Sequence, residues 1–321
     1  MRLLPLVLFF LAGLPAAAEK PTVLVVSGAP GAERFGQLIT KWSAQWKSAA
    51  EQADATFHQI GPDEEEDAKE SLRQILAEEP KDSPHPLWLV LIGHGTFDRK
   101  RAKFNLVGPD LEASELAKWL KDFERPLVLI NCSSSSAPFL KALSGKGRSV
   151  VTATRSGYEQ SFSHLGGYLA TAIADPSADL DKDGQVSLLE AWLIAARRTA
   201  EFYKLEGRLA TEHSLLDDNG DGKGTQSDWF RGLQVTKKSA EEGLLPDGLR
   251  AHQLHLIPSE NERKLSAEQR AKRDALELEL ARLRARKAKL KEDAYYQRIE
   301  KLFLEMGRIY FPKESNPAPG E

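Results

Sequence analysis

The chain contains a single cysteine, Cys132, among its 321 residues, and this scarcity excludes several classes of protein. One cysteine cannot close an intramolecular disulfide, form a CxxC redox motif or supply several thiolates to a zinc ion. The sequence also lacks a G-x-S-x-G motif, so we do not expect the serine nucleophile of an α/β-hydrolase. A hydrophobic fraction of 41% is that of a globular protein, and the length allows one large or two small domains.

Long apolar runs are also missing beyond the N-terminus, so no membrane-spanning segment is expected there. Residues 1–18 predict a secretory signal peptide, with Arg2 as its positive region, an apolar run from Leu3 to Leu14 and small residues from Ala16 to Ala18. Leu14 stands where a lipoprotein would carry its acylated cysteine. We therefore expect a secreted or periplasmic protein without a membrane anchor.

Between residues 21 and 258, short apolar segments alternate with segments of helical periodicity. This alternation predicts an α/β fold with a three-layer, mostly parallel sheet, in one domain over residues 19–258. The expected strands are 22–26, 55–60, 87–92, 126–130, 149–152 and 252–257. The expected helices are 31–53, 64–77, 112–122, 138–143, 164–174 and 187–203.

Two of these strands end on residues that suit nucleophilic chemistry. The strand at 87–92 is followed by His94 and Gly95, and the strand at 126–130 is followed by Cys132. If the two strands are parallel neighbours, both ends lie at one edge of the sheet. An imidazole can promote formation of the reactive thiolate, and the amides of Gly95 and Cys132 are candidate oxyanion donors. Taken alone, His94 is better explained as a strand-end histidine and Cys132 as a buried thiol, and it is their occurrence together that favours a catalytic pair.

This order of elements resembles the caspase-like clan of cysteine peptidases, which includes caspases, legumain, gingipain and separase. The resemblance covers about residues 21–258. It implies that Cys132 attacks the scissile carbonyl of a polypeptide substrate and that His94 assists proton transfer to the leaving group. It also implies that residues 150–159 shape the pocket for the substrate residue before the cut. The implied substrate-binding residues are Arg155, Ser156 and Glu159.

The sequence departs from that clan around the nucleophile. Four serines, Ser133 to Ser136, follow Cys132 where caspases have Arg-Gly, and Asn131 stands where alanine is usual. A second class of function therefore stays open beside the cysteine endopeptidase. It is a non-catalytic calcium-binding adaptor or scaffold protein that keeps the fold.

Residues 179–190 fit the calcium-binding loop of an EF-hand position by position. Oxygen ligands fall at the required spacing, and Gly184 permits the sharp turn at the sixth position. The expected ligands are Asp179, Asp181, Asp183, the Gln185 carbonyl, Ser187 and Glu190. A helix is expected to follow, whereas Pro176 interrupts any helix before the loop, as in a half EF-hand of the dockerin-like sort. The alternative is an acidic turn that caps the following helix.

Residues 217–228 repeat this spacing with weaker chemistry. Gly224 replaces an apolar residue, and Asp228 is shorter than the usual glutamate at the last position; ordinary Asn-Gly and Asp-Gly turns are the alternative. The expected ligands are Asp217, Asn219, Asp221, the Lys223 carbonyl and Asp228. Both loops lie in an insert at about 175–230, and we expect structural Ca²⁺, which suits an extracytoplasmic protein.

Residues 259–321 form a charged tail, in which a helix is expected over 266–306. Residues 262–301 hold 13 basic and 8 acidic side chains, a net charge of +5 in a chain whose formal charge is −3. The basic helix could dock on the acidic core or on a second copy, as a hairpin or a coiled-coil face, and secretion argues against a nucleic-acid partner. The resemblance to legumain implies a tail that covers the active site until removed, with Asn261 at the junction.

Overall fold

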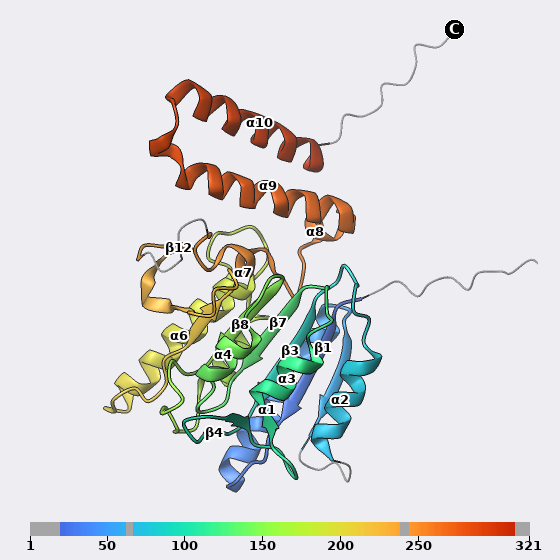
Figure 1. The fold of residues 1–321 in the computed structure, drawn as a ribbon, viewed down its shortest axis with the longest axis vertical. Helices are drawn as coiled ribbons and strands as arrows, with labels where there is room; N and C mark the ends of the chain where they lie inside the picture. The colour runs from blue at the N-terminus through green and yellow to red at the C-terminus, as the bar shows by residue number, and fades with distance from the viewer. Residues whose placement is uncertain (1–19, 62–66, 238–243, 312–321) are drawn as a thin grey trace, which may run out of the picture.

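The computed structural model describes residues 20–61, 67–237 and 244–311, so the predicted signal peptide lies outside the described residues. Its centre is a seven-stranded sheet with the order β10-β9-β8-β7-β3-β1-β2 (Figure 1). The strands from β2 to β8 in this order are parallel, and β9 and β10 are antiparallel additions at one edge. The strands are β1 Thr22–Ser27, β2 Thr56–Ile60, β3 Leu87–Ile92, β7 Leu127–Asn131, β8 Arg148–Thr152, β9 Leu215–Asp217 and β10 Thr225–Gln226.

Helices cover both faces of this sheet. Successive side chains of β1 alternate between two cores: Val23 and Val25 face one layer, and Leu24 and Val26 face the other. The first layer consists of α1 Glu33–Gln52, α5 Leu165–Ala172 and α6 Leu188–Leu205; the second consists of α2 Ala68–Glu78, α3 Ala113–Trp119 and α4 Ala137–Leu143. The three-layer α/β architecture predicted from the sequence is confirmed.

The strand predicted at 252–257 is wrong. Helix α7 Leu249–Gln253 occupies its beginning, and only an isolated bridge between His255 and Ser187 follows. The buried carboxylate of Asp218 explains the helix, because it accepts hydrogen bonds from the amides of Gly248 (3.0 Å) and Ala251 (2.7 Å) at the helix start. The apolar pattern of residues 252–257 cannot predict this cap, because the capping side chain comes from a distant part of the sequence.

Two small sheets were not predicted, because their strands are too short to show periodicity. One contains β4 Gly95–Phe97, β5 Ala102–Phe104 and β6 Leu111–Glu112; the other pairs β11 Phe230–Arg231 with β12 Gln234–Val235. The first sheet begins directly after His94, so it fixes the backbone that leaves the end of β3.

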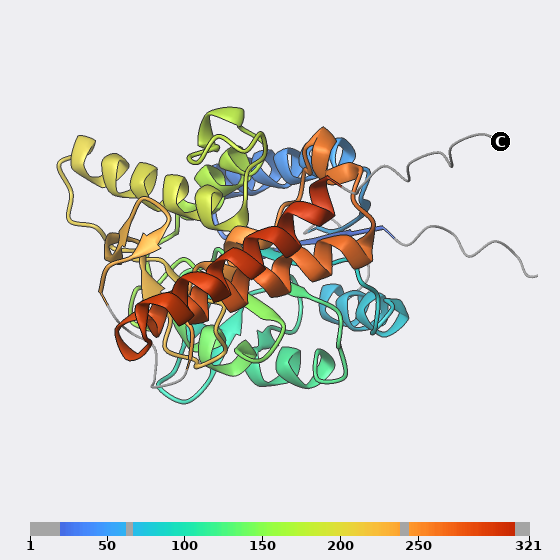
Figure 2. The same ribbon diagram turned by 90° about the horizontal axis from the view of Figure 1, so that it is seen from above.

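The tail is a helical hairpin, one of the two arrangements expected of it, and the helix predicted over 266–306 is divided in two. After the short α8 Glu260–Arg263, α9 Ala267–Ala285 and α10 Glu292–Tyr310 lie side by side (Figure 2). The chain turns at a 3₁₀ segment, Lys287–Lys289. The two helices share a small core of their own, made of Leu265, Leu276, Leu280, Leu283, Tyr295, Leu302 and Ile309. No helix in the described parts of the chain is long and apolar enough to span a membrane.

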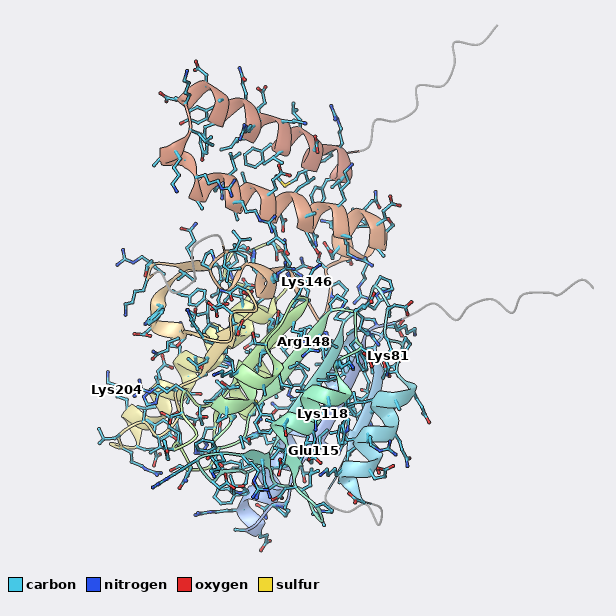
Figure 3. The ribbon with its side chains drawn as sticks, viewed as in Figure 1. Lys81, Glu115, Lys118, Lys146, Arg148 and Lys204 are labelled. Atoms are coloured by element: carbon cyan, nitrogen blue, oxygen red, sulfur yellow. The ribbon has the colours of Figure 1, made fainter. Side chains whose placement is uncertain are left out.

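The hairpin lies at the amino ends of the parallel strands. Its connection to the core includes a hydrogen bond from Arg263 to the carbonyl of Gln52, at the end of α1. Lys146, in the turn before β8, is also at this end of the core (Figure 3). His94 and Cys132 follow the carboxyl ends of β3 and β7. The hairpin therefore does not cover them, and the legumain-like covering expected from the resemblance is wrong.

Candidate functional site

The structure places His94 and Cys132 at the ends of adjacent strands, as predicted. Strands β3 and β7 pair in parallel, with Leu91 opposite Asn131. The amide of Cys132 donates to the carbonyl of Leu91 (2.8 Å), which continues the ladder by one residue. Both candidates therefore lie at one edge of the sheet.

The thiol of Cys132 is sealed within the first core. Its residue is 1% exposed and packs near Trp42 and Gly166, where a side chain on Gly166 would come within 3.0 Å of the Cys132 Cβ. Burial, with a smaller contribution from the charge of Glu212, raises the thiol pKa far above its ordinary value. A thiol in this environment stays protonated and is shielded from a substrate carbonyl.

His94 lies in an aromatic environment and does not contact the thiol by a hydrogen bond. The rings of Phe35 and Phe162 each lie 5.1 Å from the imidazole, centroid to centroid. Burial lowers the pKa of His94, and a hydrogen bond to the Pro30 carbonyl partly opposes this. Among the described residues, no hydrogen bond joins His94 to Cys132. The structure thus brings the pair to one edge without assembling a dyad.

Both predicted oxyanion donors already have acceptors. The amide of Gly95 donates to the hydroxyl of Ser134 (3.0 Å), which itself donates to the Gly95 carbonyl (3.1 Å). The amide of Cys132 is used by the sheet, as described above. Contrary to our expectation, neither amide is available to an oxyanion in this conformation.

The serine run that follows Cys132 has a structural role. Ser133 donates both its amide (3.0 Å) and its hydroxyl (2.6 Å) to the Asn131 side chain. Ser136 bonds to the hydroxyl of Thr154 after β8 (3.1 Å). All four serines are buried, and the hydroxyls of Ser133, Ser134 and Ser136 hold the strand ends together.

Two of the three predicted pocket residues line a cavity. Arg155 and Glu159 belong to the wall of a cavity of about 470 Å³ that also includes His213. Glu159 accepts hydrogen bonds from the Arg155 amide (2.9 Å) and from the His213 ring. The Ser156 hydroxyl instead accepts the amide of Tyr158 (3.1 Å), within the loop itself. These contacts shape the loop at the same end of the sheet as His94.

The first predicted calcium loop folds around the side chain of Asp179. Asp179 accepts hydrogen bonds from the amides of Lys182 (2.7 Å) and Gly184 (3.1 Å). Candidate ligand oxygens of Asp179, Asp181 and Asp183 lie within 4.8 Å of one another. Burial raises the pKa of Asp183; hydrogen bonds from Gln185 oppose this rise, and the charges of Asp181 and Glu190 add to it by a smaller amount.

Glu190 closes the first loop. One oxygen of its buried carboxylate accepts the amides of Leu180 (2.7 Å) and Asp181 (3.3 Å), and the other accepts the amide and hydroxyl of Ser187 (2.8 Å each). The same contacts form a capping box at the start of α6. The predicted helix cap and the predicted ligand are therefore the same side chain.

The second loop repeats this hydrogen-bond pattern. Asp217 accepts the amides of Gly220 (2.9 Å) and Gly222 (2.7 Å), at the same two steps along the loop as in the first loop. Asn219 accepts the amide of Asp221 (2.9 Å). Asp221 in turn accepts the amide of Lys223 (2.9 Å). In the first loop, the equivalent hydrogen bond is from the amide of Gln185 to Asp183 (3.0 Å).

Asp228, predicted as the last ligand of the second loop, is directed elsewhere. It is exposed and forms an ion pair with Lys237 (3.2 Å). It lies in a 3₁₀ segment, Ser227–Trp229, whereas Glu190 lies in the first turn of an α-helix. Without an α-helix after the loop, this position does not turn back toward the other predicted ligands.

Asp247, and not Asp228, closes the second loop by hydrogen bonds. One oxygen of its buried carboxylate accepts the amides of Asp218 (3.0 Å) and Asn219 (3.2 Å), and the other accepts the hydroxyl of Thr225 (2.6 Å). These are the second, third and ninth loop positions, which are the three positions that Glu190 contacts in the first loop. Burial, and then the charge of Asp218, raises the pKa of Asp247.

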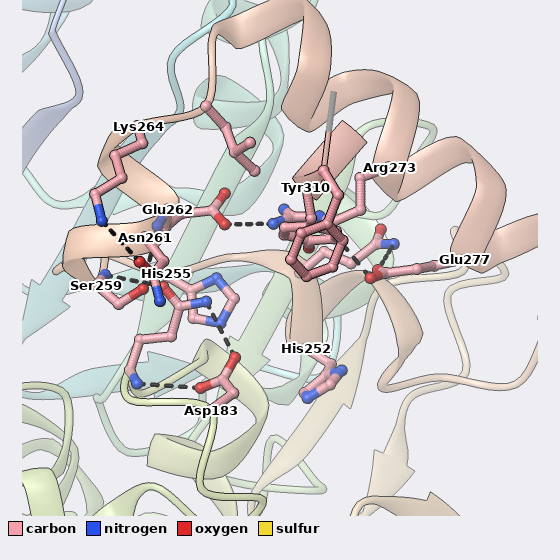
Figure 4. Close-up of a pocket in the computed structure, with 14 residues that line it drawn as sticks. Asp183, His252, His255, Ser259, Asn261, Glu262, Lys264, Arg273, Glu277 and Tyr310 are labelled. Atoms are coloured by element: carbon pink, nitrogen blue, oxygen red, sulfur yellow. Dashed lines mark hydrogen bonds and ion pairs between the residues drawn. The ribbon is translucent and has the colours of Figure 1, made fainter. Parts of the chain in front are cut away.

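The first loop also contacts the base of the hairpin. The side-chain oxygen of Gln185 accepts the amide of Ser259 (3.0 Å), and Asp181 bonds to His252 of α7 (2.9 Å). A cavity of about 420 Å³ separates the loop from the hairpin, with Asp183 and Arg273 on different sides of it (Figure 4). Both loops thus lie at the end of the molecule opposite His94.

Comparison with known proteins adds a likeness of fold. No protein-family model and no curated protein matches the chain. Among solved structures, the chain is similar to the Drosophila initiator caspase Dronc, with a TM-score of 0.40 and 14% identity over 64% of this chain and 81% of that one. It is also similar to Caspase-1 from Spodoptera frugiperda, with a TM-score of 0.45 and 8% identity over 62% of this chain and 86% of that one. Likeness at this level says nothing about activity.

Proposed function

We propose that the protein is a calcium-binding scaffold, in which two loops hold Ca²⁺ at the hairpin end of an α/β core. The observation that supports this best is the repeated hydrogen-bond pattern of the two loops, each closed by a buried carboxylate, Glu190 or Asp247. Oxygen-only ligand sets of this type suit a hard divalent cation. A bound ion would offset the repulsion among the clustered carboxylates and stabilise this end of the molecule.

The residues that would hold each ion follow from the loops. In the first loop they are Asp179, Asp181, Asp183, the Gln185 carbonyl, Ser187 and Glu190. In the second they are Asp217, Asn219, Asp221, the Lys223 carbonyl and Asp247. The ions would supply positive charge and crosslink loop segments, with no part in bond cleavage.

Calorimetric titration with Ca²⁺ tests this proposal. We expect two binding events and a rise in Tm for the wild type, one event for Asp181→Asn and one for Asp247→Asn. Asp228→Asn is the matched control and is expected to retain both events, because Asp228 points away from the loop. Circular dichroism confirms that each variant is folded. Absence of binding heat together with an unchanged Tm in saturating Ca²⁺ would overturn the proposal.

A cysteine endopeptidase that uses His94 and Cys132 is the second candidate. The pairing of β3 with β7 favours it, because that pairing brings the histidine and the cysteine to one edge of the sheet. This function needs a rearrangement that exposes the thiol and frees the amides of Gly95 and Cys132. A polypeptide would then be the substrate.

Activity assays distinguish the two candidates. The full chain is incubated with a fluorogenic peptide library and a thiol-directed probe, with and without Ca²⁺, and Cys132→Ala serves as the control. Cleavage and labelling that depend on Cys132 would establish the peptidase. Calcium binding without either result favours the scaffold.

We also propose an extracytoplasmic location, secreted or periplasmic, on the basis of the signal-like residues 1–18. Mass spectrometry of the protein from its native host tests this. A mature N-terminus near residue 19 is expected, and an intact Met1 on cytoplasmic protein would contradict it.

A further inference from the structure

Helix α10 carries an exposed apolar stripe on its outer side. Eleven large hydrophobic side chains of the described residues are exposed, and five of them lie on α10 or directly after it. The five are Tyr296, Phe303, Leu304, Tyr310 and Phe311, each between 46% and 81% exposed. Three of them, Tyr296, Phe303 and Tyr310, recur every seven residues, so they line one side of the helix. A concentration of this kind marks a contact surface.

The hairpin core does not use this stripe. The residues of α10 that face α9 are Tyr295, Leu302 and Ile309, each 6% exposed. Helix α9 lies between α10 and the α/β core (Figures 1 and 2). Within the described residues, therefore, nothing covers the outer side of α10.

Gly307 lies within this surface and has no reason to be glycine in the single chain. Its φ is helical, and no atom lies within 4 Å of the position that a Cβ would take. Glycine inside a helix costs about 1 kcal/mol relative to alanine. A glycine on an open helix face lets another backbone approach closely. Gly307 is therefore suited to a close contact with a second helix.

The charges beside the stripe are opposite at its two ends. Glu292, Asp293, Arg298 and Glu300 are exposed in the first half of α10, and Lys301 and Arg308 are exposed in the second half. Lys301 pairs with Glu305 of its own helix, whereas Glu300 and Arg308 have no ion-pair partner among the described residues. Two such helices side by side in opposite directions would place Glu300 of one beside Arg308 of the other.

We propose that α10 is a dimerisation surface whose partner is α10 of a second copy of this chain, antiparallel to the first. The two-fold axis passes between Phe303 and Leu304, as required for a self-complementary interface. In this register Tyr296 faces Phe311 of the other copy, and Glu300 lies beside Arg308. A two-fold dimer of this kind closes on itself and leaves both calcium loops and the His94 edge accessible.

Sedimentation velocity on the full chain tests the proposal. A concentration-dependent monomer–dimer equilibrium is expected between about 1 and 100 μM. The double substitution Phe303→Glu with Leu304→Glu should leave only monomer. Leu205→Glu with Leu209→Glu is the matched control: these leucines are 86% and 90% exposed on another part of the molecule, and the dimer should persist. Monomer at every concentration of the wild type would overturn the proposal, as would a dimer that survives the α10 substitutions.

Charge exchange tests the antiparallel register. Glu300→Arg alone and Arg308→Glu alone should each weaken the dimer by about tenfold or more, because each places like charges together. The double exchange should restore wild-type affinity. Failure of this rescue in folded variants, judged by circular dichroism, would exclude the register.

Cysteine crosslinking gives an independent measurement. On a Cys132→Ala background, Phe303→Cys lies at the two-fold axis and should form a disulfide dimer under mild oxidation. Tyr296→Cys faces residue 311 of the other copy and should remain monomeric on a non-reducing gel. Equal crosslinking at both positions would indicate parallel helices and contradict the proposal.

Discussion

Burial determines the reactivity of Cys132. The thiol lies in the first core with a strongly raised pKa, so we expect slow reaction with Ellman's reagent in the native state and one equivalent after denaturation. Ser161→Cys is the matched control, because Ser161 is exposed and its replacement should add one fast-reacting thiol. Rapid labelling of wild-type Cys132 would contradict the buried state and support the peptidase.

The pKa of His255 predicts a loss of stability in acid. Burial lowers this pKa from 6.5 to about 3 in the folded chain, whereas the unfolded chain takes up the proton near 6.5. Stability from this residue is therefore present above pH 6.5 and is lost as pH falls toward 3. Tm measured across this range should fall less steeply for His255→Gln than for the wild type. Equal slopes for the wild type and His255→Gln would contradict the prediction.

For single residues, positions along the strands could be predicted from the sequence, but burial and long-range contacts could not. The positions of His94 and Cys132 at one sheet edge could be predicted, because strand periodicity fixes where each strand stops. Whether the thiol is exposed depends on Trp42 and Gly166, which come from two other helices. Asp247 was missed because the fold, not the spacing, brings it to the second loop. The local sequence around Asp247 shows only the turn signal Pro-Asp-Gly at 246–248.

At the scale of elements, contact between α1 and α5 depends on glycine. A Cβ on Gly167 would come within 2.4 Å of the Trp42 indole nitrogen, so Gly167→Ala is expected to lower the free energy of unfolding by about 1–3 kcal/mol. Gly307→Ala is the matched helical control. It meets no atom within 4 Å and should stabilise the hairpin slightly. Urea denaturation at a concentration where the chain is monomeric measures both, and equal effects would contradict the packing argument.

Long elements were predictable and short ones were not. Five strands of the central sheet and six helices appear where apolar periodicity placed them, with ends shifted by a few residues. The antiparallel edge strands β9 and β10 and the sheet of β4, β5 and β6 are two or three residues long, which is too short for a periodic signal. The break in the tail required knowledge that residues 276–283 pack against residues 295–309.

At the scale of the whole molecule, the hairpin should open separately from the α/β core. Its hydrophobic cluster is distinct from the two clusters that cover the sheet. Leu302→Ala removes a buried side chain of the hairpin and should cost about 2–5 kcal/mol in its local stability. Hydrogen exchange should show faster exchange in α9 and α10 with β3 unchanged, whereas Leu89→Ala should speed exchange in β3. Equal loss of protection in both regions for either variant would indicate one cooperative unit.

The origin of the closing carboxylate gives the two loops different folding requirements. Glu190 is part of its own loop, so local chain segments suffice to assemble the first set of proposed ligands. The second set forms only after Asp247 meets Asp218, 29 positions away. An ion bound there would restrain that long segment much as a disulfide does, by lowering the entropy of the unfolded chain. The single cysteine cannot form an intramolecular disulfide, so a bound ion would be the crosslink of this segment. Unlike a disulfide, it would form and dissociate with the local calcium concentration.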